Sequence, residues 1–185
     1  MTTAIERDGE AQRALIAGDR AAAQRAFADA ADLYRRSWEQ APPGAYGRLV
    51  GMLKSAILAR DAAAQGGYAR AALADEQAVA GSPTASYARA LAALISGDDE
   101  DALRWSEAMA GGSEAFERTA RAIAALATRD EHGYAAALDE IVCDFEQRQG
   151  HLTGVAIADT ALVLEQLAGA RGMAGGVRSA LLPSI

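Results

Sequence analysis

The residues best suited to nucleophilic chemistry in this sequence are one cysteine and two histidines. Cys143 is the only cysteine, and the histidines are His132 and His151. A cysteine nucleophile needs a histidine base and a third group that orients the base. Asp144 follows Cys143 directly and Glu140 lies about one helical turn before it, and neighbouring carboxylates disfavour the reactive thiolate. We therefore expect Cys143 to be a structural, partly buried cysteine and the protein not to be an enzyme.

Metal binding is the second chemistry that these residue types allow. His151, Cys143, Asp144 and Glu140 come from one predicted helix and its end, and Asp159 comes from the next helix. No two of them have the spacing of a His-Glu-x-x-His or Cys-x-x-Cys motif, which places two ligands on one ion. We therefore expect no metal and no cofactor. We expect His151 to lie at the end of the preceding helix, where a cation interacts favourably with the helix dipole.

Asp159 is the most informative single residue. It lies in the stretch 155–168, which is apolar nearly all round and is predicted to be a buried helix. An unpaired carboxylate in such surroundings would be very unfavourable. Two interpretations stay open: Asp159 faces a pocket or a partner, or it pairs with an arginine such as Arg121, Arg171 or Arg178.

The acidic run at residues 98–101, Asp-Asp-Glu-Asp, contains calcium-ligand types. It lacks the ligand spacing and the glycine of a calcium loop. We expect it to begin a helix, because carboxylates are stabilised by the dipole at a helix N-terminus.

Trp38 and Trp105 are the two tryptophans of the chain. Either side chain could anchor an interface, because buried tryptophans dominate many binding surfaces. The alternative is that both belong to the core, which is the commoner place for an aromatic residue at helical spacing. Both are kept as candidate interaction residues.

One short phrase recurs four times and divides the chain. Each copy is an apolar helix end, then Gly or Arg, then an aspartate; the aspartates are Asp19, Asp61, Asp98 and Asp130. The Gly or Arg can end one helix and the Asp can cap the next. The intervals of 42, 37 and 32 residues are typical of stacked helical hairpins.

The composition indicates an all-α fold. Hydrophobic residues make up 51% of the 185 positions and aromatic residues only 5%, with alanine dominant. Alanine has the highest helix propensity, and no stretch alternates in the manner of a strand. We expect one domain, residues 1–185, of about nine helices. Their approximate ranges are 3–17, 20–40, 45–59, 62–80, 83–96, 100–110, 114–128, 131–149 and 155–168.

The charge of the chain argues against two classes of partner. The formal net charge is −7 and the basic residues are scattered, whereas nucleic acid and anionic membranes require a basic surface. No apolar run reaches the roughly 20 residues that cross a bilayer. The first residues lack the layout of a signal peptide. We expect a cytoplasmic protein that binds neither nucleic acid nor membrane.

The turn phrase resembles a degenerate tetratricopeptide repeat. With Gly18 as the turn glycine, Ala23, Phe27 and Ala30 occupy the small, aromatic and small positions of the repeat's second helix. The intervals straddle the usual ~34 residues, and the tryptophan and terminal proline of the repeat are missing. The resemblance implies stacked hairpins but not a peptide-binding groove.

A second pattern covers about residues 117–185. It runs Ala-Leu-Ala-Thr-Arg-Asp at 125–130, Glu-Gln-Arg-Gln-Gly-His at 146–151, an apolar helix, and Ser-Ala-Leu-Leu-Pro at 179–183. This order is similar to the C-terminal half of a helical immunity-protein family of bacterial polymorphic-toxin systems. The resemblance implies a non-catalytic protein that neutralises a toxin. The tryptophan–histidine pair of that family is absent here.

The leading hypothesis is therefore a non-enzymatic protein–protein interaction module, with toxin neutralisation as its sharpest form. The alternative is a small-molecule-binding or enzymatic helical bundle with a pocket near Asp159 and His151. Self-association as a structural protein is the third possibility. A broad concave or aromatic surface would favour the protein-interaction module. A deep pocket with convergent polar groups at Asp159 would favour the small-molecule-binding or enzymatic bundle. A large two-fold apolar interface would favour self-association.

Overall fold

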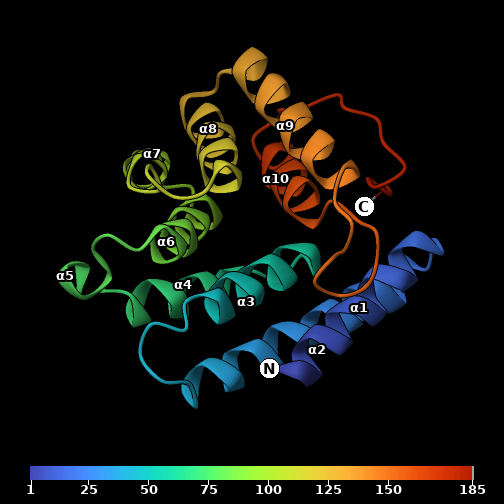
Figure 1. Ribbon diagram of the computed structural model, residues 1–185, viewed down its shortest axis with the longest axis horizontal. Helices are drawn as coiled ribbons and strands as arrows, with labels where there is room; N and C mark the ends of the chain where they lie inside the picture. Colours follow the sequence, from blue (N-terminus) through green and yellow to red (C-terminus); the bar gives the residue numbers. More distant parts are fainter. Residues whose placement is uncertain (185) are drawn as a thin grey trace.

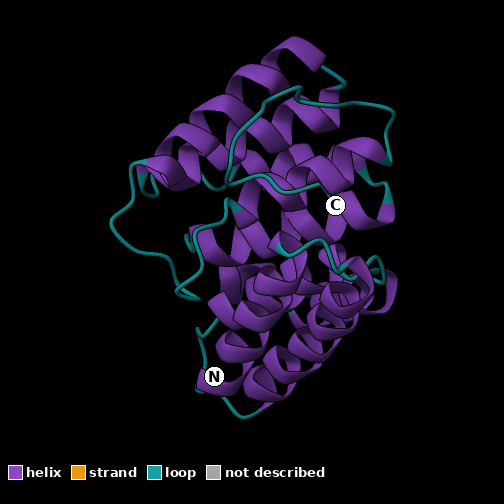
Figure 2. Cartoon of the chain, turned by 90° about the vertical axis from the view of Figure 1, so that its right-hand side faces the viewer, coloured by secondary structure: helices purple, strands orange, loops and turns teal. Residues whose placement is uncertain are grey.

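The structure of the chain is a computed structural model that describes residues 1–184. Figures 1 and 2 show helices joined by loops, with no strand among these residues, so the all-α prediction is confirmed. Ten helices are present in the described part instead of about nine. They are α1 (Thr2–Ile16), α2 (Arg20–Glu39), α3 (Gly47–Leu58), α4 (Ala63–Ala72), α5 (Glu76–Val79), α6 (Pro83–Ser96), α7 (Asp99–Glu107), α8 (Glu114–Thr128), α9 (Glu131–Glu146) and α10 (Asp159–Gly169).

The four repeated phrases all lie between helices and share one backbone geometry. The residue before each aspartate is left-handed, with φ of 80°, 61°, 76° and 59° in chain order. Each aspartate N–H donates to the carbonyl oxygen five residues earlier, for example Asp98 to Ala93 at 3.0 Å. This pattern is a Schellman ending, which satisfies a carbonyl that the helix leaves unpaired. The residues in the left-handed position are Gly18, Arg60, Gly97 and Arg129.

Three of the four aspartates cap the following helix as expected. The side chains of Asp19, Asp98 and Asp130 each accept a hydrogen bond from the backbone N–H three residues later, at 2.9–3.1 Å. The prediction is wrong for Asp61, because α4 begins later, at Ala63, with no side-chain cap. The helices on either side of Asp61 contact each other little, since α4 packs against α6 instead.

The predicted helix 62–80 is interrupted after Leu73. The guanidinium of Arg89, on α6, donates to the Leu73 carbonyl and so satisfies the helix end. Asp75 then caps the short α5 by accepting from Gln77 and Ala78. The interruption depends on a contact with α6, which the local sequence does not show.

The predicted helix 155–168 begins only at Asp159. Val155 and Ile157 are buried, but they belong to the loop that connects α9 to α10. The N–H of Ala158 donates at 2.9 Å to the carbonyl of Leu181 in the C-terminal segment, so the last residue before the helix is bonded to another part of the chain. Asp159 is therefore at the N-terminus of α10, and its predicted place inside a helix is wrong.

Helix α10 lies between helices from the two halves of the sequence. It packs against α3, which is in the first half of the sequence, and against α8 and α9, which are in the second half. In Figure 1 the loop after α9 descends toward α1 and returns to α10. The carboxyl-terminal segment passes back over the helices, with Val177, Leu181 and Leu182 against the core. Among residues 1–184, no helix combines the length and apolarity that a membrane span requires.

Candidate functional site

The N-terminus of α10 is fixed by an ion pair with α3. Lys54 Nζ lies 2.5 Å from Asp159 Oδ2 and 3.1 Å from Thr160 Oγ1. Both charged side chains are largely enclosed, with 17% of Lys54 and 27% of Asp159 exposed. The predicted pairing of Asp159 is present, but its partner is a lysine and none of the three arginines considered.

Lys54 is held in its charged form. Burial alone would lower the pKa of Lys54, but the charge of Asp159 and the hydrogen bond between them raise that pKa above its ordinary value. A protonated amine has no lone pair for nucleophilic attack. Lys54 therefore acts as a positive anchor for α10.

A buried polar cluster extends from this pair to the first helical hairpin. Asp8 of α1 is 9% exposed and accepts hydrogen bonds from Tyr34 Oη at 3.4 Å and Gln12 Nε2 at 3.5 Å. Gln12 in turn accepts from Thr153, in the loop before α10. Burial, and next the negative charge of Asp159, raise the pKa of Asp8 to about 7. These contacts join α1 to the loop that leads into α10.

His151 and Asp159 do line one cavity, as the small-molecule hypothesis required. The cavity has a volume of about 180 Å³. His151 does not cap the preceding helix, because α9 ends at Glu146 and its C-cap is Gln147. The imidazole stacks on Phe145, with 6.1 Å between ring centroids. Its Nδ1 is buried and has no hydrogen-bond partner among the described residues.

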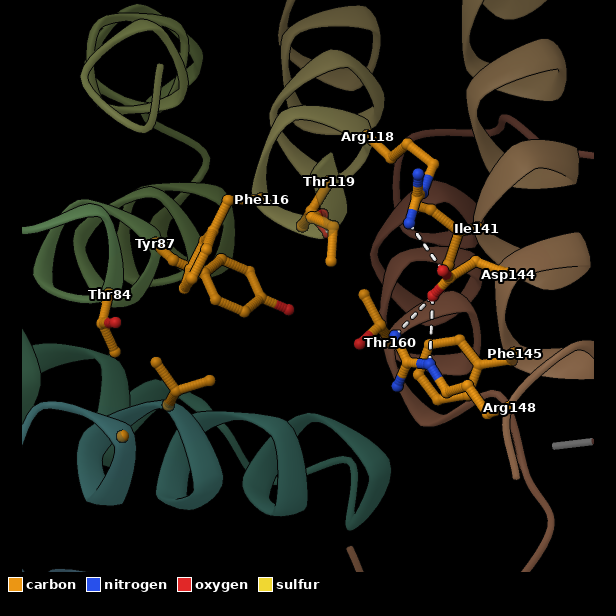
Figure 3. Close-up of a pocket in the computed structure, with 13 residues that line it drawn as sticks. Thr84, Tyr87, Phe116, Arg118, Thr119, Ile141, Asp144, Phe145, Arg148 and Thr160 are labelled. Atoms are coloured by element: carbon orange, nitrogen blue, oxygen red, sulfur yellow. Dashed lines mark hydrogen bonds and ion pairs between the residues drawn. The ribbon is translucent and has the colours of Figure 1, made fainter. Parts of the chain in front are cut away.

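A second cavity adjoins the first and shares part of its wall. Its volume is about 210 Å³, and it lies where α3, α6, α8, α9 and α10 meet (Figure 3). Phe145, Arg148 and Thr160 line both cavities. We call the two together the central crevice. Further apolar side chains that line the second cavity are those of Val50, Tyr87, Phe116 and Ile141.

Two arginines on the side of the cavity opposite Tyr87 and Phe116 share one carboxylate. Arg118 Nη2 donates to Asp144 Oδ1 at 2.6 Å, and Arg148 Nη2 donates to Asp144 Oδ2 at 2.5 Å. Figure 3 shows these bonds on the side of the cavity opposite Tyr87 and Phe116. Arg118 comes from α8 and is 18% exposed. Two guanidiniums against one carboxylate leave this wall with an excess of positive charge.

The hydroxyl of Tyr87 points into the space between these two walls (Figure 3). Tyr87 is 7% exposed, and its hydroxyl completes no hydrogen bond with a described residue, although Thr160 approaches it. Burial raises the pKa of Tyr87, so the hydroxyl keeps its proton and can donate. A buried hydroxyl without a partner is unfavourable, and a ligand that pairs with it would remove that cost.

Comparison of the chain with known protein families, curated proteins and solved structures finds no match. The crevice must therefore be interpreted from its own geometry. That geometry combines an aromatic wall, a positively charged wall and a hydroxyl that lacks a partner.

The remaining predicted residues lie apart from the crevice. Trp105 is 7% exposed and packs under the guanidiniums of Arg89 and Arg104, so it does not present an outward interface anchor. Trp38 is half-buried, and its ring is tilted by 31° to that of Tyr46, with 5.9 Å between the ring centroids.

Cys143 is exposed on α9, which corrects its predicted partial burial. Its position follows from the turn of the helix, because Ile141, Val142 and Phe145 take the buried face. Within residues 1–184, no three His, Cys, Asp or Glu side chains are grouped so that they could hold a metal ion.

Sequence reasoning missed Lys54 and Arg118 as site residues. A signal for Lys54 was present, because it is the only lysine in a chain with many arginines and it lies in an apolar helix. Arg118 carries no such signal. Its role depends on how α8 packs against α9.

Proposed function

We propose that this protein is a non-enzymatic binding protein whose central crevice holds a small organic molecule. The observation that carries the proposal is the Tyr87 hydroxyl, which is buried, lacks a partner and faces an apolar cavity. Binding sites of this kind combine an apolar lining with a few placed polar groups. Lys54 and Asp159 supply further polar groups in the smaller cavity, and Thr160 lines both cavities.

The state of the reactive side chains supports a role without catalysis. Lys54 is paired and charged, and Cys143 is on the surface. His151 lies against Phe145 and has Asp159 as its acidic neighbour in the smaller cavity. A cysteine or serine nucleophile with an adjacent histidine base is not assembled among these residues, and that pairing is what acyl transfer needs.

The protein-binding hypothesis, including toxin neutralisation, stays a prediction that no observation here tests. It would gain support from a broad aromatic surface, but Trp105 is buried and Trp38 is half-buried against the core. The large hydrophobic side chains that are exposed in the described part are scattered: Met1, Ile16 and Leu152. For this reason the crevice, and not the outer surface, carries our proposal.

A neutral probe tests the proposed function. We expect 4-ethylphenol, a ring with one hydroxyl, to bind saturably in ligand-observed NMR titrations. The variant Thr84→Phe places a ring at the edge of the larger cavity and should abolish binding. Thr128→Phe, at the exposed end of α8 and remote from the cavity, is the matched control and should bind as the parent does. No saturable binding, or equal binding by Thr84→Phe, would overturn the proposal.

A further inference from the structure

We infer that the molecule held in the central crevice is a small aromatic acid, one aromatic ring that carries a short chain ending in a carboxylate. This inference rests on the proposed function and specifies its ligand. It follows from three features of the larger cavity: its charge, its aromatic wall and its size.

The charge of the cavity has the opposite sign to that of the whole protein. The chain carries a formal net charge of −7, whereas Arg118 and Arg148 face a single carboxylate, Asp144, in the cavity wall. Glu114 also approaches Arg118 at 3.5 Å, but it is 90% exposed and lies in solvent. A site with one surplus positive charge, partly shielded from water, selects a monoanion. Guanidinium groups match carboxylate geometry well.

The wall opposite the arginines is suited to an aromatic ring. Tyr87 and Phe116 form an edge-to-face pair, with 6.3 Å between centroids and 84° between planes. Phe145 is 6% exposed and borders the same space from the arginine side, where the guanidinium of Arg148 lies over its ring (Figure 3). Aromatic rings prefer edge-to-face and offset arrangements at such distances. A ligand ring can join the existing pair and keep its carboxylate on the arginine side.

The volume sets the size of the ligand. The larger cavity measures about 210 Å³. An apolar cavity of about 150 Å³ holds benzene, so the space accommodates one ring and a short chain. The Tyr87 hydroxyl, which faces the interior, is then available to donate to an oxygen of the bound acid.

The test compares 3-phenylpropionate with 3-phenylpropionamide, which has the same shape and no charge. In calorimetric titrations at low salt, we expect the acid to bind the parent protein at least tenfold more tightly than the amide, because a hydrogen bond to a charged group is the stronger kind. Arg118→Gln should reduce the affinity for the acid to about that for the amide. Asp144 keeps Arg148 as its partner in this variant.

Arg121→Gln is the matched control. Arg121 is also on α8 and also forms an ion pair with α9, through Glu140, but it lies outside the crevice. We expect this variant to retain the tenfold preference. Should Arg118→Gln fail to fold, Arg148→Gln replaces it, because Arg148 lies beyond the end of α9 and contributes the second guanidinium.

The outcomes separate the two proposals. If 4-ethylphenol binds while the acid and the amide bind equally, or if the acid retains its preference in Arg118→Gln, the inference about the ligand is wrong and the proposed function stands. If 4-ethylphenol fails to bind, the proposed function is wrong, and the inference about the ligand, which rests on it, is wrong as well. Binding of 4-ethylphenol, together with a tenfold preference that is lost in Arg118→Gln and kept in Arg121→Gln, supports both.

Discussion

Asp8 and Asp159 show how two carboxyl groups a short distance apart take different roles. Asp159 has Lys54 as a direct partner at 2.5 Å. Asp8 is more deeply enclosed and has only the neutral donors Tyr34 and Gln12, at 3.4 Å and 3.5 Å. Asp8 therefore retains its proton to a much higher pH than an ordinary aspartate does.

Protonation of Asp8 makes stability depend on pH. Its pKa is about 7 in the folded protein and about 4 in the unfolded chain, so the folded state binds the extra proton between these values. The free energy of unfolding should therefore fall as the pH rises from about 4 to about 7. We expect Asp8→Asn to be more stable than the parent at pH 8 by about 1–3 kcal/mol and nearly equal to it at about pH 4, where Asp8 is protonated in the folded protein and largely so in the unfolded chain. Urea unfolding at both pH values measures this.

Asp29→Asn is the control for Asp8→Asn, since Asp29 is exposed and pairs with Arg7 at the surface. This variant should follow the pH profile of the parent. If Asp8→Asn instead loses stability at pH 8, the ionised form of Asp8 contributes a favourable interaction, and our description of the cluster is incorrect.

At the scale of the elements, the four Schellman turns differ mainly in the residue that takes the left-handed position. Gly97 suits a φ of 76°, whereas Arg60 at 61° experiences the steric strain of a β-carbon. Arg60 is exposed and has no ion pair among the described residues. Arg60→Gly should therefore raise the free energy of unfolding by about 1 kcal/mol, and Gly97→Ala should lower it by about 1 kcal/mol. Chemical denaturation of both variants measures the two changes in the free energy of unfolding. These two changes must have opposite signs.

The same turns show which elements the sequence could predict. The glycines and aspartates are local signals, and the helix boundaries near Asp19, Asp98 and Asp130 were predicted from them. The break after Leu73 and the late start of α10 at Asp159 were missed, because each is stabilised by a residue far along the chain. At the break, Arg89 donates a hydrogen bond to the Leu73 carbonyl. Before α10, the Leu181 carbonyl accepts a hydrogen bond from the N–H of Ala158. An apolar run such as 155–158 indicates burial but not conformation.

The site was predicted only in part for the same reason. Asp159 was identified because a carboxylate stands out in an apolar stretch, and His151 because it is one of only two histidines in the chain. Their cavity is completed by Lys54, which lies 105 residues before Asp159. Arg118 and Tyr87 looked like an ordinary surface arginine and an ordinary core aromatic. Only the packing of α6, α8 and α9 brings them to opposite walls of one cavity.

For the molecule as a whole, the sizes of the side chains between the helices explain why a crevice exists. Alanine is the commonest buried residue of the described chain, and its small side chain lets helices pack closely. Several larger aromatic and charged side chains, by contrast, line the space where α3, α6, α8, α9 and α10 meet. Large, rigid side chains leave space between them that alanines would not. The position of α10 between the halves therefore creates both the cavity and its polar groups.

The most direct test of the central claim is the mapping of backbone amide chemical shifts during a titration with 4-ethylphenol. We predict that the shifts concentrate at the residues that line the crevice, including Thr84, Phe116, Ile141 and Thr160, and that the groove between α7 and α8 near Ser106 stays unchanged. Shifts confined to that groove or to other surface positions, or the absence of any saturable shift, would contradict the claim that the crevice is a binding site.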